Sequence, residues 1–366
     1  MHNWQIIISG FVVFFGILLY FYIDLEILKS YYNMATYSKK DYKKFIDSYS
    51  LYEKGITVDK NDYKNNVSHI YETNFEKNTN IINETYDILH DICTIIGLKK
   101  MYIPPEFDSN KSIQENQELH EKNIAKSLNV KPNSKILEVG CGCGRISNFI
   151  SKETNSYVYG ININKKHIED AINFSKKEKN DKTFFKYGNL NEPIEFEDNF
   201  FDAIYVVQPL TYCNNLDNLF KEFRRVLKPN GKIVLSDYVL LDDFDKNNEH
   251  HKKLLFSSKR IMEALNSRYY KYFEKSAEKN NFKTLYSDYF KKDDNTYTGS
   301  EINQLKGALN KCSSIYKTIK KMDVFNILKT YYDFFDNWEL WSNDLIEASE
   351  KKLWYMSWKF VFQNKK

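Results

Sequence analysis

The stretch "KILEVGCGCGRISNFI" at residues 135–150 constrains the fold of this chain more than any other. An apolar run reaches Glu138 and passes into three alternating glycines, Gly140, Gly142 and Gly144, where a helical pattern begins. Glycines allow tight backbone geometry and let a ligand approach where a Cβ atom would block it. A strand that ends in this way at a helix start predicts a turn that cradles a nucleotide.

Two cysteines, Cys141 and Cys143, alternate with these glycines. A zinc site needs about four ligands, and the sequence offers no second pair of this kind. We therefore interpret both cysteines as small residues that fill a crowded turn, and we predict no metal site. The five cysteines of the chain are scattered and odd in number, which suits a reducing compartment without a disulfide framework.

Strands and helices alternate from residue 112 to about residue 240, which predicts an α/β fold with a parallel, doubly wound sheet. The apolar runs predict strands at 135–139, 157–161, 183–188, 201–207 and 232–239. The periodic segments between them predict helices from about 144, at 165–178 and at 216–227. An aromatic final strand is expected at 353–362.

The pattern Glu138-x-Gly140-x-Gly142-x-Gly144 resembles motif I of class I S-adenosylmethionine-dependent methyltransferases. This resemblance implies a Rossmann-like seven-stranded sheet and S-adenosylmethionine as cofactor. Asn162 stands where the family places an acid on the ribose hydroxyls, and its amide can still accept a hydrogen bond. Asn189 stands where an Asp commonly meets the adenine amino group. Asp202 is the implied strand-start acid, and Lys228-Pro229-Asn230-Gly231 is the implied turn before the fifth strand. The implied cofactor-binding residues are Glu138, Gly140, Cys141, Gly142, Gly144, Asn162, Asn189, Leu190 and Val207.

Longer stretches over roughly 83–255 resemble the sterol 24-C-methyltransferases. "MYIPPEFDSNKSIQENQELHEKNIA" (101–125) is similar to that family at Phe107, Ser112, His120 and Glu121. "TYDILHD" (85–91), "YGININKKHIEDA" and "DYVLLDDFDKNNEHHKK" (237–253) are similar to further segments of it. The resemblance implies a membrane-associated enzyme that adds a methyl group to a carbon atom of a sterol.

The chain departs from this family at two segments that are thought to line the sterol end of its site. The family's "YEYGWG" reads "CTIIGL" at 93–98, and its "IEATCHAP" reads "VQPLTYCNN" at 207–215. Gln208 therefore replaces a Glu, and Tyr212 replaces a His. These changes leave open methylation of another lipid or an isoprenoid, methylation at sterol ring position 4, and a catalytically silent cofactor-binding scaffold.

Methylation of an alkene carbon leaves a cation, which aromatic faces stabilise and one base deprotonates. Asp237, at the carboxyl end of a predicted strand, and His120 are the candidate bases, with Gln208 and Tyr212 completing the catalytic set. The structural alternatives are a cap or loop role for Asp237 and a structural hydrogen bond for His120. His251 is expected to cap a helix. The candidates for an aromatic lining, each of which also suits the core, are Tyr86, Tyr102, Phe107, Tyr212 and Tyr238.

Residues 6–23 form an uncharged apolar run. At about 1.5 Å per residue this run nearly crosses a hydrocarbon core roughly 30 Å thick. No Lys or Arg precedes it and no cleavage site follows it, which argues against a signal peptide. Lysines follow it at positions 29, 39, 40, 43 and 44, which predicts a single-pass anchor in the endoplasmic reticulum membrane with a cytosolic catalytic domain.

The chain therefore divides into an anchor, a helical linker and cap, a cofactor-binding core, and a substrate-binding region that completes the sheet, at 1–28, 29–111, 112–240 and 241–366. A helical insertion is expected at 295–350, with an apolar face that suits either a substrate tunnel or ordinary core. The expected partners are a sterol or other lipid and the membrane, with a homo-oligomer left open. The net charge of +4 is too small to argue for nucleic-acid binding.

Overall fold

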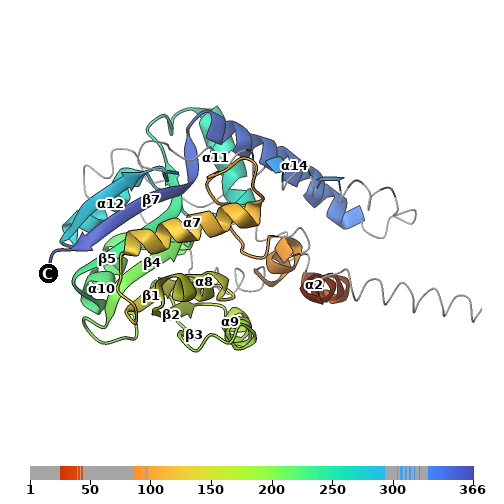
Figure 1. The fold of residues 1–366 in the computed structure, drawn as a ribbon. Helices are drawn as coiled ribbons and strands as arrows, with labels where there is room; N and C mark the ends of the chain where they lie inside the picture. The colour runs from red at the N-terminus through yellow and green to blue at the C-terminus, as the bar shows by residue number, and fades with distance from the viewer. Residues whose placement is uncertain are drawn as a thin grey trace, which may run out of the picture.

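Seven strands form one sheet in the computed structural model of the chain, in the order β3-β2-β1-β4-β5-β7-β6 (Figure 1). The first five strands pair in parallel, and β7 runs antiparallel to both β5 and β6. This arrangement confirms the predicted seven-stranded Rossmann-like sheet. The strands are β1 (Lys135–Val139), β2 (Tyr157–Asn162), β3 (Thr183–Tyr187), β4 (Phe201–Val207), β5 (Leu227–Leu240), β6 (Phe282–Asp288) and β7 (Trp354–Asn364).

The structure describes residues 25–38, 86–94, 98–292 and 329–366, together with isolated positions within 40–43 and 303–321. None of the helices in these parts has the length and apolar character needed to cross a membrane. The apolar run at 6–23 lies outside the described residues, so the anchor stays a prediction.

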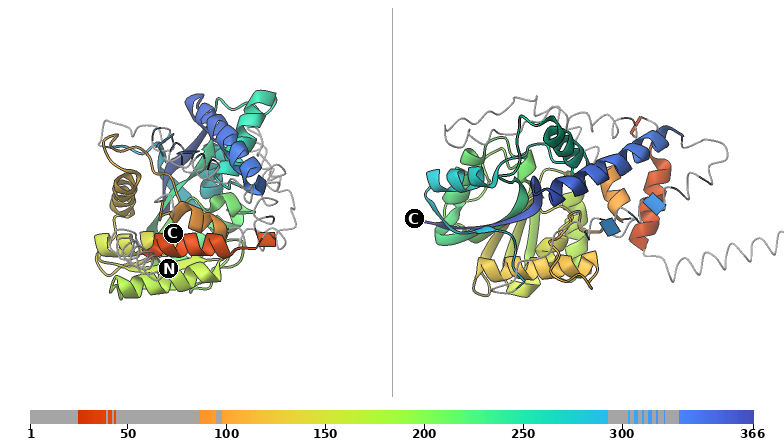
Figure 2. Two further views of the ribbon diagram at one scale, coloured as in Figure 1. Left: turned by 90° about the vertical axis from the view of Figure 1, so that its right-hand side faces the viewer. Right: turned by 90° about the horizontal axis from the view of Figure 1, so that it is seen from above.

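Helices cover both faces of the sheet (Figures 1 and 2). On one face α7 contacts α8 and α8 contacts α9, and on the other α10 contacts α12. Among the described residues, the helices with both ends defined are α2 (Leu25–Thr36), α7 (Ile113–Leu128), α8 (Arg145–Thr154), α9 (Lys165–Lys177), α10 (Leu216–Val226), α11 (Glu249–Ile261), α12 (Tyr270–Lys279) and α14 (Lys329–Glu350), with a 3-10 turn η1 at Leu210–Tyr212.

Successive strand residues are buried on opposite faces, as expected for a parallel sheet between two helical layers. Ile136 and Tyr205 pack with Ile124 of α7 in one core cluster. Leu137 and Ile204 pack in another cluster, with α10. Burial on both faces explains why these strands read as continuous apolar runs.

Polar side chains fix where the helices begin. Ser112 and Glu115 form a capping box at the start of α7. The side chain of Asn248 caps α11 and accepts from the backbone N–H of His251 at 3.3 Å. His251 is therefore not the cap that we expected, because it lies inside α11 and its Nδ1 accepts from the backbone N–H of Asp245 at 3.1 Å.

The turn expected at 228–231 interrupts β5. Leu227 pairs with Phe201 and Lys232 pairs with Ala203, so the intervening residues of β5 loop out while β4 advances by two residues. Asp202 accepts from the backbone N–H of Lys135 at 2.8 Å, and its other carboxylate oxygen lies 2.6 Å from Lys228 Nζ. The carboxylate thereby ties the start of β1 to this turn.

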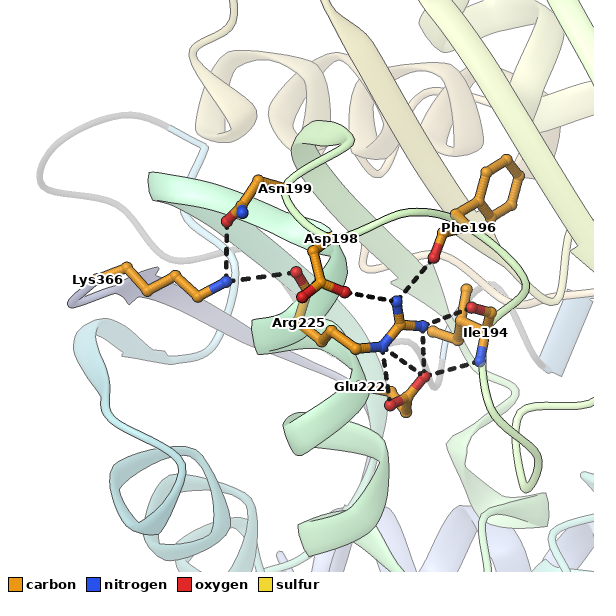
Figure 3. A network of polar contacts seen from close by, with 7 residues as sticks. All are labelled: Ile194, Phe196, Asp198, Asn199, Glu222, Arg225 and Lys366. Atoms are coloured by element: carbon orange, nitrogen blue, oxygen red, sulfur yellow. Dashed lines mark hydrogen bonds and ion pairs between the residues drawn. The ribbon is translucent and has the colours of Figure 1, made fainter.

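Arg225, in the last turn of α10, holds a polar network at the end where the parallel strands begin (Figure 3). Its guanidinium donates to the carbonyl of Ile194 at 2.6 Å, to the carbonyl of Phe196 at 2.7 Å and to Glu222. Lys366 donates to the carbonyl of Arg225 at 3.3 Å. The loop before β4 and the end of the chain are thus anchored at the edge of the sheet where β4 and β5 start.

The predicted C-terminal helical region is confirmed where the structure describes it, since α14 packs along α11 (Figure 1). Ser257 donates to Asp344 at 2.6 Å, and Leu345 and Ala348 lie in a core cluster with Trp354. These contacts pack the C-terminal half of α14 against the core, while Leu340 nearer its start is 62% exposed, and none of the described residues of α14 lines the cavity at the carboxyl ends of the parallel strands.

Candidate active site

A cavity lies at the carboxyl ends of β1, β2 and β4. The strand order reverses at β1, because β2 and β3 follow on one side and β4 on the other, and open α/β sheets bind ligands at such a point. The helical segment at 86–94 contributes Tyr86, Leu89 and His90 to the wall opposite the strands. The cavity therefore lies where the sequence placed the site.

The three glycines of the turn differ in what surrounds them. All have positive φ angles, of 78°, 49° and 72° at Gly140, Gly142 and Gly144. A Cβ atom at Gly140 would lie 2.7 Å from Pro209, and one at Gly144 would lie 2.8 Å from Ala171, whereas one at Gly142 meets nothing within 4 Å. Gly140 and Gly144 are thus needed for packing, and Gly142 borders open space.

Cys141 fills a crowded place, as the sequence predicted. It is 5% exposed, and a Cβ atom at Gly160 of β2 would lie 2.7 Å from the Cys141 Cβ. The interpretation of Cys141 as a small packing residue is confirmed, although it also contributes to the cavity wall.

Glu138 lies beneath the turn and does not line the cavity. It is buried and accepts a hydrogen bond from the hydroxyl of Ser147 on α8, so it fastens β1 to the helix that follows the turn. Burial raises the pKa of its carboxyl from 4.5 to about 7. In this geometry Glu138 supports the turn, and its direct contact with a cofactor stays a prediction.

This raised pKa predicts how Glu138 changes the pH dependence of stability. The folded chain holds the proton of Glu138 more tightly than the unfolded chain does, so the free energy of unfolding falls as pH rises from about 4.5 to about 7. Glu138→Gln should reduce that fall. Urea unfolding at about pH 5 and about pH 8 measures the change, and Glu153→Gln, at an exposed position of α8, is the control. If the free energy of unfolding fell equally with pH in wild type and in Glu138→Gln, the raised pKa of Glu138 would be contradicted.

Most residues that the sequence assigned to a cofactor come together in the cavity wall. Asn162 ends β2, and Asn189 accepts from the backbone N–H of Asn191 at 3.0 Å, which fixes the loop after β3. Gly144 lies behind the wall with Glu138. The predicted residues that line the cavity are Gly140, Cys141, Gly142, Asn162, Asn189, Leu190 and Val207.

Aromatic side chains line another part of the cavity wall. Tyr86 donates to the hydroxyl of Tyr212 at 2.8 Å, and Tyr212 donates to the carbonyl of Glu263 at 2.5 Å. Tyr238 donates to the side-chain oxygen of Gln208 at 2.9 Å. Tyr212 and Gln208 thus line the cavity as predicted.

Gln208 is held firmly in place. Its amide nitrogen donates to the carbonyl of Met356 at 3.0 Å and to the hydroxyl of Ser357 at 3.3 Å, both on β7. Its φ angle of 63° is unusual for a residue other than glycine. These contacts join the end of β4 to β7 across β5.

Asp237 does not line the cavity. Successive side chains of a strand point to opposite faces, and Tyr238 takes the place beside the cavity. The Asp237 carboxylate accepts from the backbone N–H groups of Leu210 at 2.9 Å and Tyr238 at 2.8 Å. Burial raises its pKa to about 7. These contacts position η1 and Tyr238, so of the roles considered for Asp237 the geometry favours the structural one.

His120 is also away from the cavity. Its Nδ1 lies 3.3 Å from the Tyr102 hydroxyl, and its Nε2 lies 3.1 Å from the hydroxyl of Ser236 on β5. Burial lowers its pKa to about 3, so the imidazole is neutral. Of the two roles considered for His120, the geometry favours the structural one. Phe107, packed in the core with Ile124, does not line the cavity, whereas Tyr86, Tyr102 and Tyr238 do.

Several cavity residues were missed by sequence reasoning. Glu263 is a buried acid with a φ angle of 47°, directly after α11. It lies beyond the stretch that resembles the sterol family, and a single acid in "RIMEALNS" carries no motif. The other missed cavity residues include His90, Cys143, Arg145, His167, Pro209, Thr211 and Met262.

Comparison with known proteins shows what part of the chain is similar to. Residues 130–288 match a family described as a methyltransferase domain. The sterol 24-C-methyltransferase of Clavispora lusitaniae is 33% identical over 138 residues, which are 37% of this chain and 36% of that protein. The sterol 24-C-methyltransferase of Schizosaccharomyces pombe is 28% identical over 179 residues, which are 48% of this chain and 47% of that protein. These matches span less than half the length of those relatives.

Solved structures share the fold at low sequence identity. The [4+2]-cyclase SpnF has a TM-score of 0.61 at 14% identity, with 78% of this chain and 96% of that chain covered. A putative sarcosine dimethylglycine methyltransferase from Galdieria sulphuraria has a TM-score of 0.54 at 19% identity, with 75% of this chain and 97% of that chain covered. Since one of these structures is named a cyclase, the fold alone does not define a reaction. Residues 130–288 therefore match a methyltransferase-domain family, and the chain shares the fold of these solved structures and resembles the sterol 24-C-methyltransferases over part of its length.

Proposed function

We propose that this chain transfers a methyl group from S-adenosylmethionine to a carbon atom of a sterol. The observation that carries the proposal is one cavity that combines two kinds of wall. The glycine turn and the asparagines after β2 and β3 form the first wall, and tyrosines with Met262 form the second. The first suits a nucleoside-containing cofactor, and the second suits an apolar acceptor.

The cofactor wall supports S-adenosylmethionine through groups that are already in place. Asn162 offers an amide oxygen to ribose hydroxyls, and Asn189 offers its side chain to the adenine amino group. Helix α8 begins directly after Gly144, and no side chain caps its first turn, so its positive end is free to face a carboxylate. When bound there, S-adenosylmethionine supplies an activated methyl group on a sulfonium.

The substrate wall supports an apolar acceptor whose reaction passes through a cation. The hydroxyls of Tyr86, Tyr212 and Tyr238 all donate to protein oxygens, so their rings are the surfaces left for a ligand. Aromatic faces stabilise cations in apolar surroundings. Rigid hydrogen bonds also hold the rings in one orientation, and positioning of this kind supplies much of the rate in such reactions.

Glu263 is the group that we assign to the proton transfer. The alkene electron pair would form the new carbon–carbon bond as the sulfur–methyl bond breaks and leaves its electrons on the sulfur, and the neighbouring carbon would then release a proton to a base. The Glu263 residue lines the cavity, and its carbonyl binds the hydroxyl of Tyr212. Asp237 and His120 remain behind the wall, so they act on this step only through the residues that they position.

A second candidate is methylation of an isoprenoid. Gln208 favours it, because a neutral amide bonded to β7 stands where the sterol family has a carboxylate. The same cofactor wall serves either acceptor.

The proposal is tested by incubating membranes that contain the full chain with labelled S-adenosylmethionine and a panel of sterols, isoprenoids and phospholipids. Label in a sterol supports the proposal, and label in an isoprenoid alone supports the second candidate. A chain that labels no lipid, while it binds the cofactor, contradicts methyl transfer to lipids and favours a silent scaffold.

The proposal includes an anchor at residues 6–23 in the endoplasmic reticulum membrane, with the catalytic domain in the cytosol. The support is the uncharged run and the lysines after it. The carboxylate of Glu26 in α2 lies 2.8 Å from Arg145 and 3.1 Å from Lys99, both in the cavity wall. A membrane segment that ends just before α2 would therefore hold the cavity close to the bilayer from which a lipid enters.

Deletion of residues 1–23 should release the chain from membranes and leave cofactor affinity within a few-fold of wild type. This cut keeps Glu26, whereas the expected domain boundary at residue 28 falls inside α2 and would remove both of its ion pairs. Sedimentation after an alkaline carbonate wash and calorimetry measure the two properties. A truncated chain that still pellets would show that residues 1–23 are not the sole attachment.

A further inference from the structure

Three metal-binding side chains meet at the cavity from three separate segments. His90 belongs to the helical segment at 86–94, Cys143 to the glycine turn, and His167 to the first turn of α9. One ligand atom from each lies within 4.8 Å of the other two, and Cys143 Sγ lies 3.9 Å from His90 Nδ1. All three residues line the cavity.

His167 adds an independent observation. It is 4% exposed, and its Nε2 atom has no hydrogen-bond partner among the described residues. Buried ring nitrogens normally have a hydrogen-bond partner. An unsatisfied one therefore indicates a position where an ion or a water molecule binds. The ring of His90 lies beside it, with centroids 5.7 Å apart. This unsatisfied nitrogen belongs to the residue that is also buried most deeply within the cluster.

The ligand types select the class of metal. Two imidazole nitrogens and one thiolate sulfur suit Zn²⁺ and similar borderline cations, whereas Mg²⁺ and Ca²⁺ prefer oxygen ligands. Zinc bonds of about 2.0–2.1 Å to nitrogen and about 2.3 Å to sulfur place tetrahedral ligand atoms roughly 3.5 Å apart. The 3.9 Å between Cys143 Sγ and His90 Nδ1 is near that spacing. The other ligand atoms lie within 4.8 Å of one another, and small side-chain rotations would shorten those distances to the same spacing.

We propose that His90, Cys143 and His167 bind one Zn²⁺ ion, with a fourth coordination position open to the cavity. On binding, the Cys143 thiol releases its proton to solvent and its sulfur bonds the metal, while each neutral imidazole bonds through one nitrogen. The ion would join the helical segment at 86–94 to the glycine turn and α9. Cys141 takes no part, because it packs against Gly160. The proposal does not depend on methyl transfer.

The full chain, freed of metal by a chelator, is titrated with Co²⁺ as a spectroscopic substitute for Zn²⁺. Wild type should bind one Co²⁺ per chain, with a sulfur-to-metal charge-transfer band that Zn²⁺ abolishes. Cys143→Ser should remove the band, and His90→Gln and His167→Gln should each weaken binding by at least about tenfold. Cys213→Ser, at a buried cysteine outside the cavity, and His250→Gln, at an exposed histidine, are matched controls that should leave binding unchanged.

Absence of the charge-transfer band in wild type would overturn the proposal, and so would a band that persists in folded Cys143→Ser. Thermal unfolding checks the fold of each variant, and Ser is close enough to Cys in size for that variant to fold. X-ray absorption of the zinc-loaded wild type gives a test without substitutions. One sulfur at about 2.3 Å with nitrogens at about 2.0–2.1 Å is expected, and a shell without sulfur contradicts the site.

Discussion

Gly142→Asn should weaken the binding of S-adenosylmethionine by about 100-fold or more, or ~2.7 kcal/mol, while the chain stays folded. A side chain at Gly142 would enter the open space beside the turn, where no protein atom lies within 4 Å of a Cβ atom. Asn tolerates a φ angle of 49° better than most residues, so the effect reports lost space rather than backbone strain. Isothermal titration calorimetry measures the affinity, and thermal unfolding measures the fold.

Two other glycines provide the controls. Gly307→Asn also adds a side chain where a Cβ atom meets nothing, but outside the cavity, so it should leave affinity unchanged. Gly144→Ala should instead lower the free energy of unfolding by about 1–3 kcal/mol, because its Cβ would lie 2.8 Å from both Ala171 and Phe185. A folded Gly142→Asn chain with wild-type affinity would show that the cofactor does not lie on this turn.

Glu263→Gln should lower turnover on the lipid acceptor by about 100-fold or more, with cofactor affinity within a few-fold of wild type. The substitution keeps the shape and the backbone carbonyl that binds Tyr212, but it removes the base that collects the proton. Steady-state kinetics with the acceptor identified from the lipid panel measures turnover. Glu249→Gln, at an exposed position in the first turn of α11, is the matched control and should be neutral.

Asp237→Asn separates positioning from base chemistry. An amide cannot accept from both Leu210 and Tyr238 as the carboxylate does, so this variant should lose about 1–3 kcal/mol of stability. We expect any loss of turnover in Asp237→Asn to occur together with this loss of stability.

Near-normal turnover in Glu263→Gln would remove Glu263 from the mechanism. A large loss of turnover in Asp237→Asn at unchanged stability would restore Asp237 as the candidate base.

The sequence predicted those features whose causes are local. The glycine turn follows from three alternating glycines, and the parallel strands follow from short apolar runs between helical segments. Asn162, Asn189 and Val207 were assigned to the cofactor through the resemblance to methyltransferase motifs, and the structure places each at the cavity because each ends or follows a strand whose end lies at that edge of the sheet.

The tyrosines and Gln208 of the substrate wall were named from the sequence, but its acid could not be predicted, because the position of that acid depends on contacts between distant segments. Asp237 ends up behind the wall since strand residues alternate between faces, and a strand end in sequence does not say which face borders the cavity. Glu263 reaches the cavity only because the chain folds back after α11. His90 and His167 lie 53 and 24 residues from Cys143, so a search for a second pair of cysteines could not find them.

Transfer of a methyl group to carbon is tested most directly with S-adenosylmethionine that carries a ¹³C methyl group. Membranes containing the full chain are incubated with it and a sterol mixture, and the lipid products are examined by ¹³C nuclear magnetic resonance and mass spectrometry. We expect one labelled methyl group bonded to a sterol carbon, absent with Gly142→Asn. A label bonded to oxygen or nitrogen, or a label found only in lipids other than sterols, would contradict sterol C-methylation.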